Sequence, residues 1–219
     1  MPYRRPCDSA RNVGPAAFRT DARLKLDRCI KQLRSFLASL ARRSGNRLSL
    51  NASAKETGIS APTAKSWLGV ACRYGLARLA GDPEGHESMV FLSDTGIMCR
   101  LLGIGKWEDL VLSPLRDDVV RTYAFNELLR GRNSIGAEAQ MYASQTADFR
   151  ADWKRRYSII IDPNLEVTQE KAALAKKASG QGRKALVLYL GDVTYNMGNL
   201  DCISFRDWTR LSSEIDYFS

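Results

Sequence analysis

Apolar residues recur at intervals of three and four between Asp21 and Gly45, which is the spacing of an amphipathic helix. The apolar positions are Leu24, Leu26, Cys29, Ile30, Leu33, Phe36, Leu37 and Leu40. The other face carries the basic residues Arg23, Lys25, Arg28, Lys31 and Arg34. The pattern predicts a helix that starts near Asp21 and ends near Gly45, since glycine commonly follows a helix C-terminus. Residues 1–20 show no sustained periodicity and contain several prolines, which predicts a flexible basic arm.

Residues 51–68 predict a short helix, a tight turn and a second helix. Gly58 permits the turn, Ile59 fills the angle between the helices, and Ser60 can cap the second helix. Pro62 is tolerated in a first helical turn, where no backbone N–H is needed. Inward-facing residues then follow at helical spacing, at Trp67, Leu68 and Cys72. Turn, cap and core positions therefore agree with a helix-turn-helix.

Two short apolar runs, 76–79 and 89–92, predict strands joined by a glycine- and proline-containing turn. Two strands directly after a recognition helix are typical of a wing, and residues 93–103 predict a short closing helix. We therefore expect a winged helix-turn-helix domain over residues 21–104.

The remaining residues, 105–219, predict a compact α/β domain. The expected order is a helix, three strands, a helix and a strand, over residues 117–130, 140–143, 149–153, 157–161, 166–178 and 185–190. The fold class expected for the whole chain is α+β.

The net charge of +9 is concentrated at one end of the chain. Residues 1–47 carry 12 Lys and Arg against 3 Asp and Glu, and the other residues are balanced. Such a basic region attracts phosphate backbones, although a solubilising tail explains residues 1–20 equally well. No apolar run approaches the ~20 residues that span a bilayer, and no secretory signal is evident, so a cytoplasmic protein is expected. The scattered cysteines and the single histidine predict no zinc site.

Several stretches together resemble one family. They are residues 52–68, 91–96, 99–104, 112–115, 126–129 and 188–192. They resemble the C-terminal region of bacterial and archaeal AAA-type ATPases that contain the domain of unknown function 4143. The resemblance implies a winged helix followed by a domain similar to the PD-(D/E)XK restriction-nuclease fold.

The sequence departs from that family at two sites. It has no G-x-x-x-x-G-K-[ST] loop, so ATPase activity is not expected. The nuclease-like site keeps Asp152 and Asp162 as candidate catalytic residues and metal ligands, with Glu127 as a possible third ligand. Arg121 and Asn164 replace the family's Glu and Lys. No cofactor is expected unless this site is functional, in which case Mg²⁺ is the expected ion. Otherwise Asp152 and Asp162 are ordinary strand-end residues.

Three functions remain open from the sequence. The first is binding of nucleic acid, with double-stranded DNA expected. The candidate contact residues are Thr63, Lys65, Ser66, Arg73, Arg42, Arg43 and Arg47. The second is a protein-interaction or regulatory role, in which the chain forms a homodimer or docks on a separately encoded ATPase. The third is a Mg²⁺-dependent nuclease. The chain could also be a fragment of a formerly longer ATPase gene.

Overall fold

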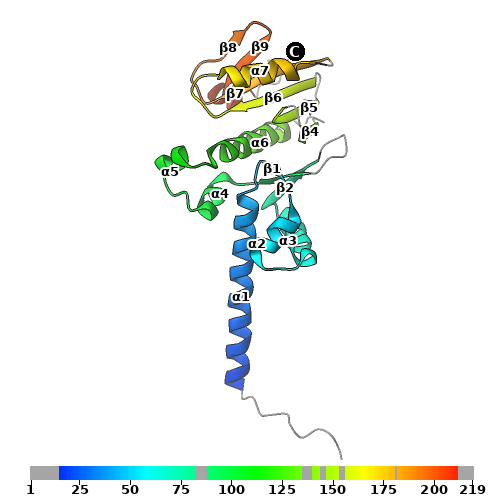
Figure 1. Cartoon of the computed structure of the whole chain (residues 1–219), viewed down its shortest axis with the longest axis vertical. Coiled ribbons are helices and arrows are strands. Elements are labelled where there is room, and N and C mark those ends of the chain that lie inside the picture. Colours follow the sequence, from blue (N-terminus) through cyan, green and yellow to red (C-terminus); the bar gives the residue numbers. More distant parts are fainter. Residues whose placement is uncertain are drawn as a thin grey trace, which may run out of the picture.

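The computed structural model describes residues 15–81, 88–134, 140–143, 147–152, 156–180 and 182–211, and these form a mixed α+β fold (Figure 1). The helices are α1 (Pro15–Ala41), α2 (Leu50–Thr57), α3 (Ala61–Arg73), α4 (Thr95–Leu102), α5 (Trp107–Leu112), α6 (Arg116–Ser134), α7 (Gln169–Ala178) and α8 (Phe205–Leu211). The strands are β1 (Asn46–Arg47), β2 (Ala77–Ala80), β3 (Met89–Leu92), β4 (Gln140–Ala143), β5 (Phe149–Asp152), β6 (Arg156–Asp162), β7 (Arg183–Tyr189), β8 (Tyr195–Met197) and β9 (Leu200–Ser204).

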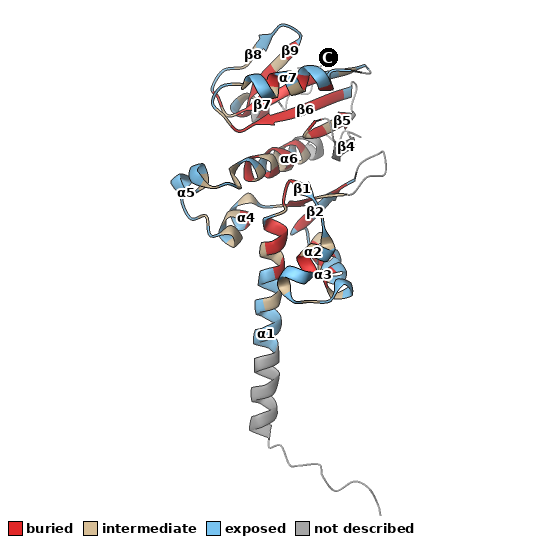
Figure 2. Cartoon of the chain, viewed as in Figure 1, coloured by how far each residue is buried: buried red, intermediate tan, exposed pale blue. Residues whose placement is uncertain are grey.

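Helix α1 is longer at its N-terminus than the sequence predicts. It begins at Pro15, where the fixed φ of proline suits a first helical turn. Residues 15–20 of the predicted arm are therefore helical, and residues 1–14 lie outside the described residues. Of the α1 residues whose burial is described, the C-terminal turns are buried, chiefly through Phe36 and Leu40, and residues 26–31 are exposed (Figure 2).

The predicted helix, turn and helix over residues 51–68 are confirmed as α2 and α3. Ser49 caps α2, and Ser60 caps α3 by accepting a 3.2 Å hydrogen bond from the backbone N–H of Thr63. Gly58 between the two helices has a φ of 65°, a left-handed conformation that glycine adopts without strain. Local capping chemistry therefore sets the angle between α2 and α3.

A three-stranded antiparallel sheet of order β1-β3-β2 lies beside these helices. Strands β2 and β3 match the two predicted strands, whereas the two-residue β1 was not predicted. The Oγ of Ser44, just before β1, accepts a 2.9 Å hydrogen bond from the N–H of Leu92 in β3. This bond fastens the end of α1 to the sheet.

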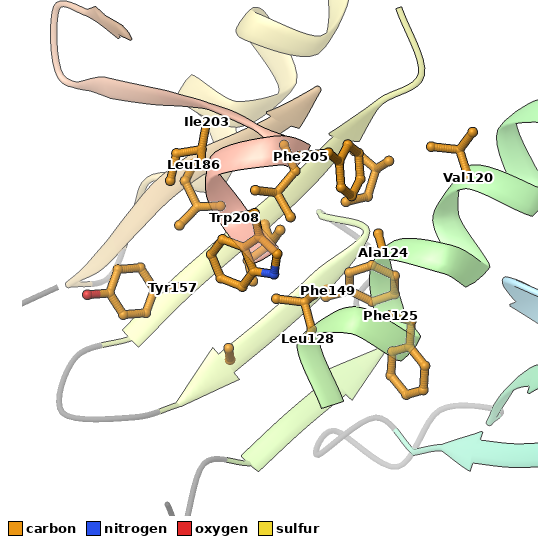
Figure 3. Close-up of a cluster of buried hydrophobic side chains, with 14 of the residues drawn as sticks. Val120, Ala124, Phe125, Leu128, Phe149, Tyr157, Leu186, Ile203, Phe205 and Trp208 are labelled. Atoms are coloured by element: carbon orange, nitrogen blue, oxygen red, sulfur yellow. The ribbon is translucent and has the colours of Figure 1, made fainter. Parts of the chain in front are cut away.

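The C-terminal sheet has six strands in the order β4-β5-β6-β7-β9-β8. Strands β4, β5 and β6 form an antiparallel meander, while β6, β7 and β9 run parallel to one another. Helix α7 covers one face through Ala172, Ala175 and Ala178. Helices α6 and α8 cover the other face, where Phe205 and Trp208 pack against sheet residues (Figure 3). Strands β8 and β9 and helices α5 and α8 were not predicted from the sequence.

The two sheets share a hydrophobic core. Phe91 of β3 is fully buried and stacks on Phe125 of α6, with ring centroids 3.8 Å apart. Phe149 of β5 lies 5.8 Å from the Phe91 ring. Ser44 and Thr122 share a buried hydrogen bond of 2.9 Å between the same two parts of the chain. The hydrophobic cores before and after residue 104, the predicted domain boundary, are therefore joined through α6.

Candidate functional site

Helix α3 has one face packed in the core and one face open to solvent. Ala64, Leu68 and Ala71 are buried, and Trp67 makes an edge-to-face contact with Phe36 of α1 at 5.8 Å. The exposed positions are Ala61, Pro62, Lys65, Ser66, Gly69, Val70 and Arg73. The core contacts fix the orientation of α3, so that these exposed side chains form a rigid surface.

Lys65 and Arg73 are the two cations of this exposed surface. Neither makes an ion pair with any residue that the structure describes. Ser66 lies beside Lys65 and is also exposed. Thr63 differs, because its hydroxyl shares a 2.8 Å hydrogen bond with the Oγ of the capping residue Ser60. Of the α3 contacts predicted from the sequence, Lys65, Ser66 and Arg73 are open to a partner, and Thr63 serves the helix cap.

Arg42 and Arg43, predicted to contact nucleic acid, are instead joined to Glu56 of α2. Arg43 Nη1 lies 2.8 Å from Glu56 Oε2, and Arg42 makes a second ion pair with the same carboxylate. Ser39 donates a further 2.8 Å hydrogen bond to it. Burial opposes ionisation of Glu56, but the hydrogen bonds from Ser39, Arg43 and Arg42 outweigh it and lower the pKa of this carboxyl. Both arginines therefore hold α1 against α2.

Arg47 and Arg78 are exposed on the three-stranded sheet, on the face opposite α3. Arg47 pairs with Met89 and Arg78 with Phe91, whereas α3 packs on the face of Ala77, Val90 and Leu92. Neither arginine makes an ion pair with a described residue. Arg47, predicted as a contact, therefore lies off the α3 surface, as does Arg78, which the sequence analysis did not select.

Exposed apolar side chains lie on α3 and β2. Val70 and Tyr74, at the end of α3, are 46% and 75% exposed, and Leu79 of β2 is 46% exposed. The exposed surface of α3 is thus mixed, with Lys65 in its first turns and Arg73 between the apolar Val70 and Tyr74 at its end.

Asp162, predicted as a metal ligand, has a structural role. Its side chain is fully buried at the end of β6. It accepts hydrogen bonds from the backbone and side chain of Thr168, at 2.8 and 2.9 Å, and from the backbone and side chain of Asn164, at 3.2 and 2.7 Å. Asn164 is therefore a donor to this carboxylate. The four bonds hold the loop that leads from β6 into α7.

The structure does not bring Asp152 and Glu127 to Asp162. Asp152 pairs with Arg156 in the β5–β6 register, and Asp162 is the other end of β6, about 20 Å away at the rise of a strand. The Asp152 side chain lies outside the described residues. Among the residues that are described, no group of three His, Cys, Asp or Glu side chains could hold a metal ion.

Glu127 lies in a polar cleft between α4 and α6. Its Oε1 is 2.7 Å from Arg130 Nη1. The cleft has a volume of about 490 Å³ and is lined by Ser93, Asp94, Thr95, Tyr123, Asn126, Glu127 and Arg130. Burial and the nearby Glu127 carboxylate raise the pKa of Tyr123.

Arg121 lies between two carboxylates. Its Nε is 2.7 Å from Asp148 Oδ1, and its Nη1 is 2.9 Å from Asp118 Oδ1. Asp148 Oδ2 also accepts a 2.7 Å hydrogen bond from the N–H of Ile161. Burial disfavours the charge on Arg121, but Asp148 and Asp118 outweigh it and raise the pKa of the guanidinium. Arg121 therefore neutralises the Asp148 carboxylate, which in turn holds the N–H of Ile161 in β6.

The comparisons with known proteins give a different family from the one expected. Residues 19–108, from α1 to the start of α5, match the model of a Domain of unknown function (DUF8612). The predicted relationship to AAA-type ATPases containing the domain of unknown function 4143 is therefore wrong, because neither family matches the chain. No curated protein and no solved structure matches it either.

In the part of the chain that the structure describes, no helix has the length and apolar composition needed to cross a membrane.

Proposed function

We propose that this chain binds double-stranded DNA through the exposed face of α3, in the manner of a winged helix. The order α1-β1-α2-α3-β2-β3 supports this proposal, as does the β1-β3-β2 sheet behind the helices. In winged-helix proteins the second helix of the turn enters the major groove and its first turns meet base edges. Lys65 and Ser66 occupy those turns here.

The observation that carries the proposal is the state of the cations on this surface. Lys65 and Arg73 are exposed on α3 and make no ion pair with a described residue. Each is free to neutralise a phosphate and to release its counterions, which supplies most of the free energy of non-specific DNA binding. The +9 net charge of the chain adds long-range attraction to the same partner.

The proposal is tested by binding to a random-sequence duplex over a salt series, with and without Mg²⁺. We expect a dissociation constant in the non-specific range, about 10⁻⁴–10⁻⁶ M, that rises steeply with salt. Absence of binding at low salt would contradict the proposal.

The same samples, run on a gel, test for cleavage. We expect intact duplex with Mg²⁺, because the candidate ligands Asp152, Asp162 and Glu127 are not brought together. The Asp162→Asn variant, purified in parallel, is the control for a contaminating nuclease. Nicking by the native chain that this variant lacks would restore the nuclease hypothesis.

For the C-terminal half, the order helix, three strands, helix and strand supports a nuclease-like architecture at the level of fold alone.

A protein-interaction role is the second candidate, and the exposed apolar residues Val70, Tyr74 and Leu79 favour it. Aromatic residues and exposed apolar patches are typical of protein interfaces. Replacing Val70 and Tyr74 by serine should leave DNA affinity nearly unchanged if these residues serve a protein partner. A loss of DNA binding in that variant would instead assign them to the DNA surface.

A further inference from the structure

Helix α1 carries an apolar stripe on the turns that precede the core. Leu26, Ile30 and Leu33 are 59%, 54% and 39% exposed. The same alternation of four- and three-residue steps continues into Leu37, which is partly buried, and Leu40, which is fully buried. Alternating steps of four and three are the a and d positions of a heptad repeat. The stripe is therefore a helix-packing seam, and among the described residues it is covered at its C-terminal end and exposed at Leu26, Ile30 and Leu33.

The exposed part of α1 lacks the packing that normally stabilises a helix. Residues 26–31 are all exposed, and Figure 2 shows this part of α1 extending away from the other described elements. Helices of this length are marginal alone in water and depend on burial of an apolar face. A second helix on the seam would supply that burial.

The charges beside the seam identify the second helix. Asp27 and Arg34 are seven residues apart and occupy the same flank, the e positions of successive heptads. Arg28 and Lys31 fall on the outer face, away from the seam. The flank therefore carries one acidic and one basic residue, one on each side of Ile30.

We propose that a second copy of this chain covers the seam, with the two α1 helices antiparallel. A two-fold axis perpendicular to the helices near residues 30 and 31 exchanges positions 27 and 34. Each Asp27 then faces the Arg34 of the other copy, so the flank is complementary to itself. A parallel pair would lack this exchange. The proposal does not depend on DNA binding.

The first test measures the mass of the full chain in solution by sedimentation equilibrium, under reducing conditions because Cys29 is an exposed free thiol. We expect twice the 24.4 kDa of one chain. Ile30→Glu should raise the dissociation constant at least about a hundredfold, since two buried isoleucines are lost per dimer. Ser35→Glu, the same change on the outer face, should leave the dimer intact. A monomeric native chain, or a dimer that Ile30→Glu leaves unchanged, would overturn the proposal.

The second test addresses the orientation of the helices. Asp27→Arg and Arg34→Asp should each weaken the dimer, by about tenfold, because each places like charges together twice. The double variant Asp27→Arg/Arg34→Asp should recover the native dissociation constant. A double variant as weak as the single ones would rule out the antiparallel pair.

Discussion

The candidate DNA contacts on α3 and the candidate metal ligand at the end of β6 have opposite surroundings. On α3, Lys65 and Arg73 are exposed. In the C-terminal half, Asp162 accepts four hydrogen bonds, and Asp148 is paired with Arg121. Asp162, which suggested a metal site, thus already has hydrogen-bond partners, while Lys65 and Arg73 of α3 make no ion pair with a described residue.

The difference shows that residue type alone is a poor guide to a site. Asp162 is buried and its oxygens already accept four hydrogen bonds, about the number that a carboxylate accommodates, so little capacity is left for a metal ion. An exposed cation on a rigid helix retains its full interaction with a phosphate. We therefore expect substitutions in the C-terminal half to change stability, and substitutions on α3 to change binding.

The largest loss of stability should follow Phe91→Ala, at the core shared by the two sheets. Removing a fully buried ring that stacks on Phe125 should lower the free energy of unfolding by about 4 kcal/mol. Urea unfolding followed by circular dichroism measures it, with Leu79→Ala on the neighbouring strand as the control, since Leu79 is half exposed. Two separate unfolding transitions in the native chain would show that the cores are independent.

The next largest loss should follow Asp162→Ala. Asn164 and Thr168 would lose their acceptor, which should lower the free energy of unfolding by about 3 kcal/mol without affecting DNA affinity. Asp192→Ala removes a carboxylate from an exposed pair with Arg206 and should change stability by less than about 0.5 kcal/mol. Equal stability of Asp162→Ala and the native chain would argue for a site held ready for a ligand.

A smaller and pH-dependent loss should follow Glu56→Gln. The folded chain lowers the pKa of Glu56, so its contribution is present above the ordinary value of 4.5 and disappears as the pH falls through the folded value. We expect a loss of about 1 kcal/mol at neutral pH that vanishes in acid. Glu166→Gln, at an exposed residue, is the control. A difference that is independent of pH would show that packing, and not charge, links α1 to α2.

The sequence predicted those features that depend on neighbouring residues. The helix boundaries at Ser60 and Gly58 follow from local capping and turn geometry, which the residues themselves encode. Strands β6 and β7 were predicted from their continuous apolar runs. Because the signals for these elements are local, the elements can be predicted without knowledge of the rest of the fold.

The features missed from the sequence depend on distant contacts. Strand β1 has two residues and exists because β3 lies beside it. The pairing of Arg121 with Asp148 joins residues 27 positions apart, and that of Arg42 with Glu56 joins two helices. The separation of Asp152 from Asp162 follows from the β5–β6 register, which a list of motif residues does not contain.

The smallest change in stability should accompany Lys65→Ala with Arg73→Ala, and this double variant tests the central claim most directly. Its unfolding should match that of the native chain within about 0.5 kcal/mol, because both side chains are exposed. Its affinity for duplex DNA should fall about tenfold or more at low salt, and the slope of log K against log salt should decrease by about 2 in magnitude. The control, Lys176→Ala with Lys177→Ala, removes the same charge from exposed positions on α7 and should keep the native slope. Equal slopes for the native chain and the α3 variant, or equal losses in the two variants, would contradict the assignment of DNA binding to α3.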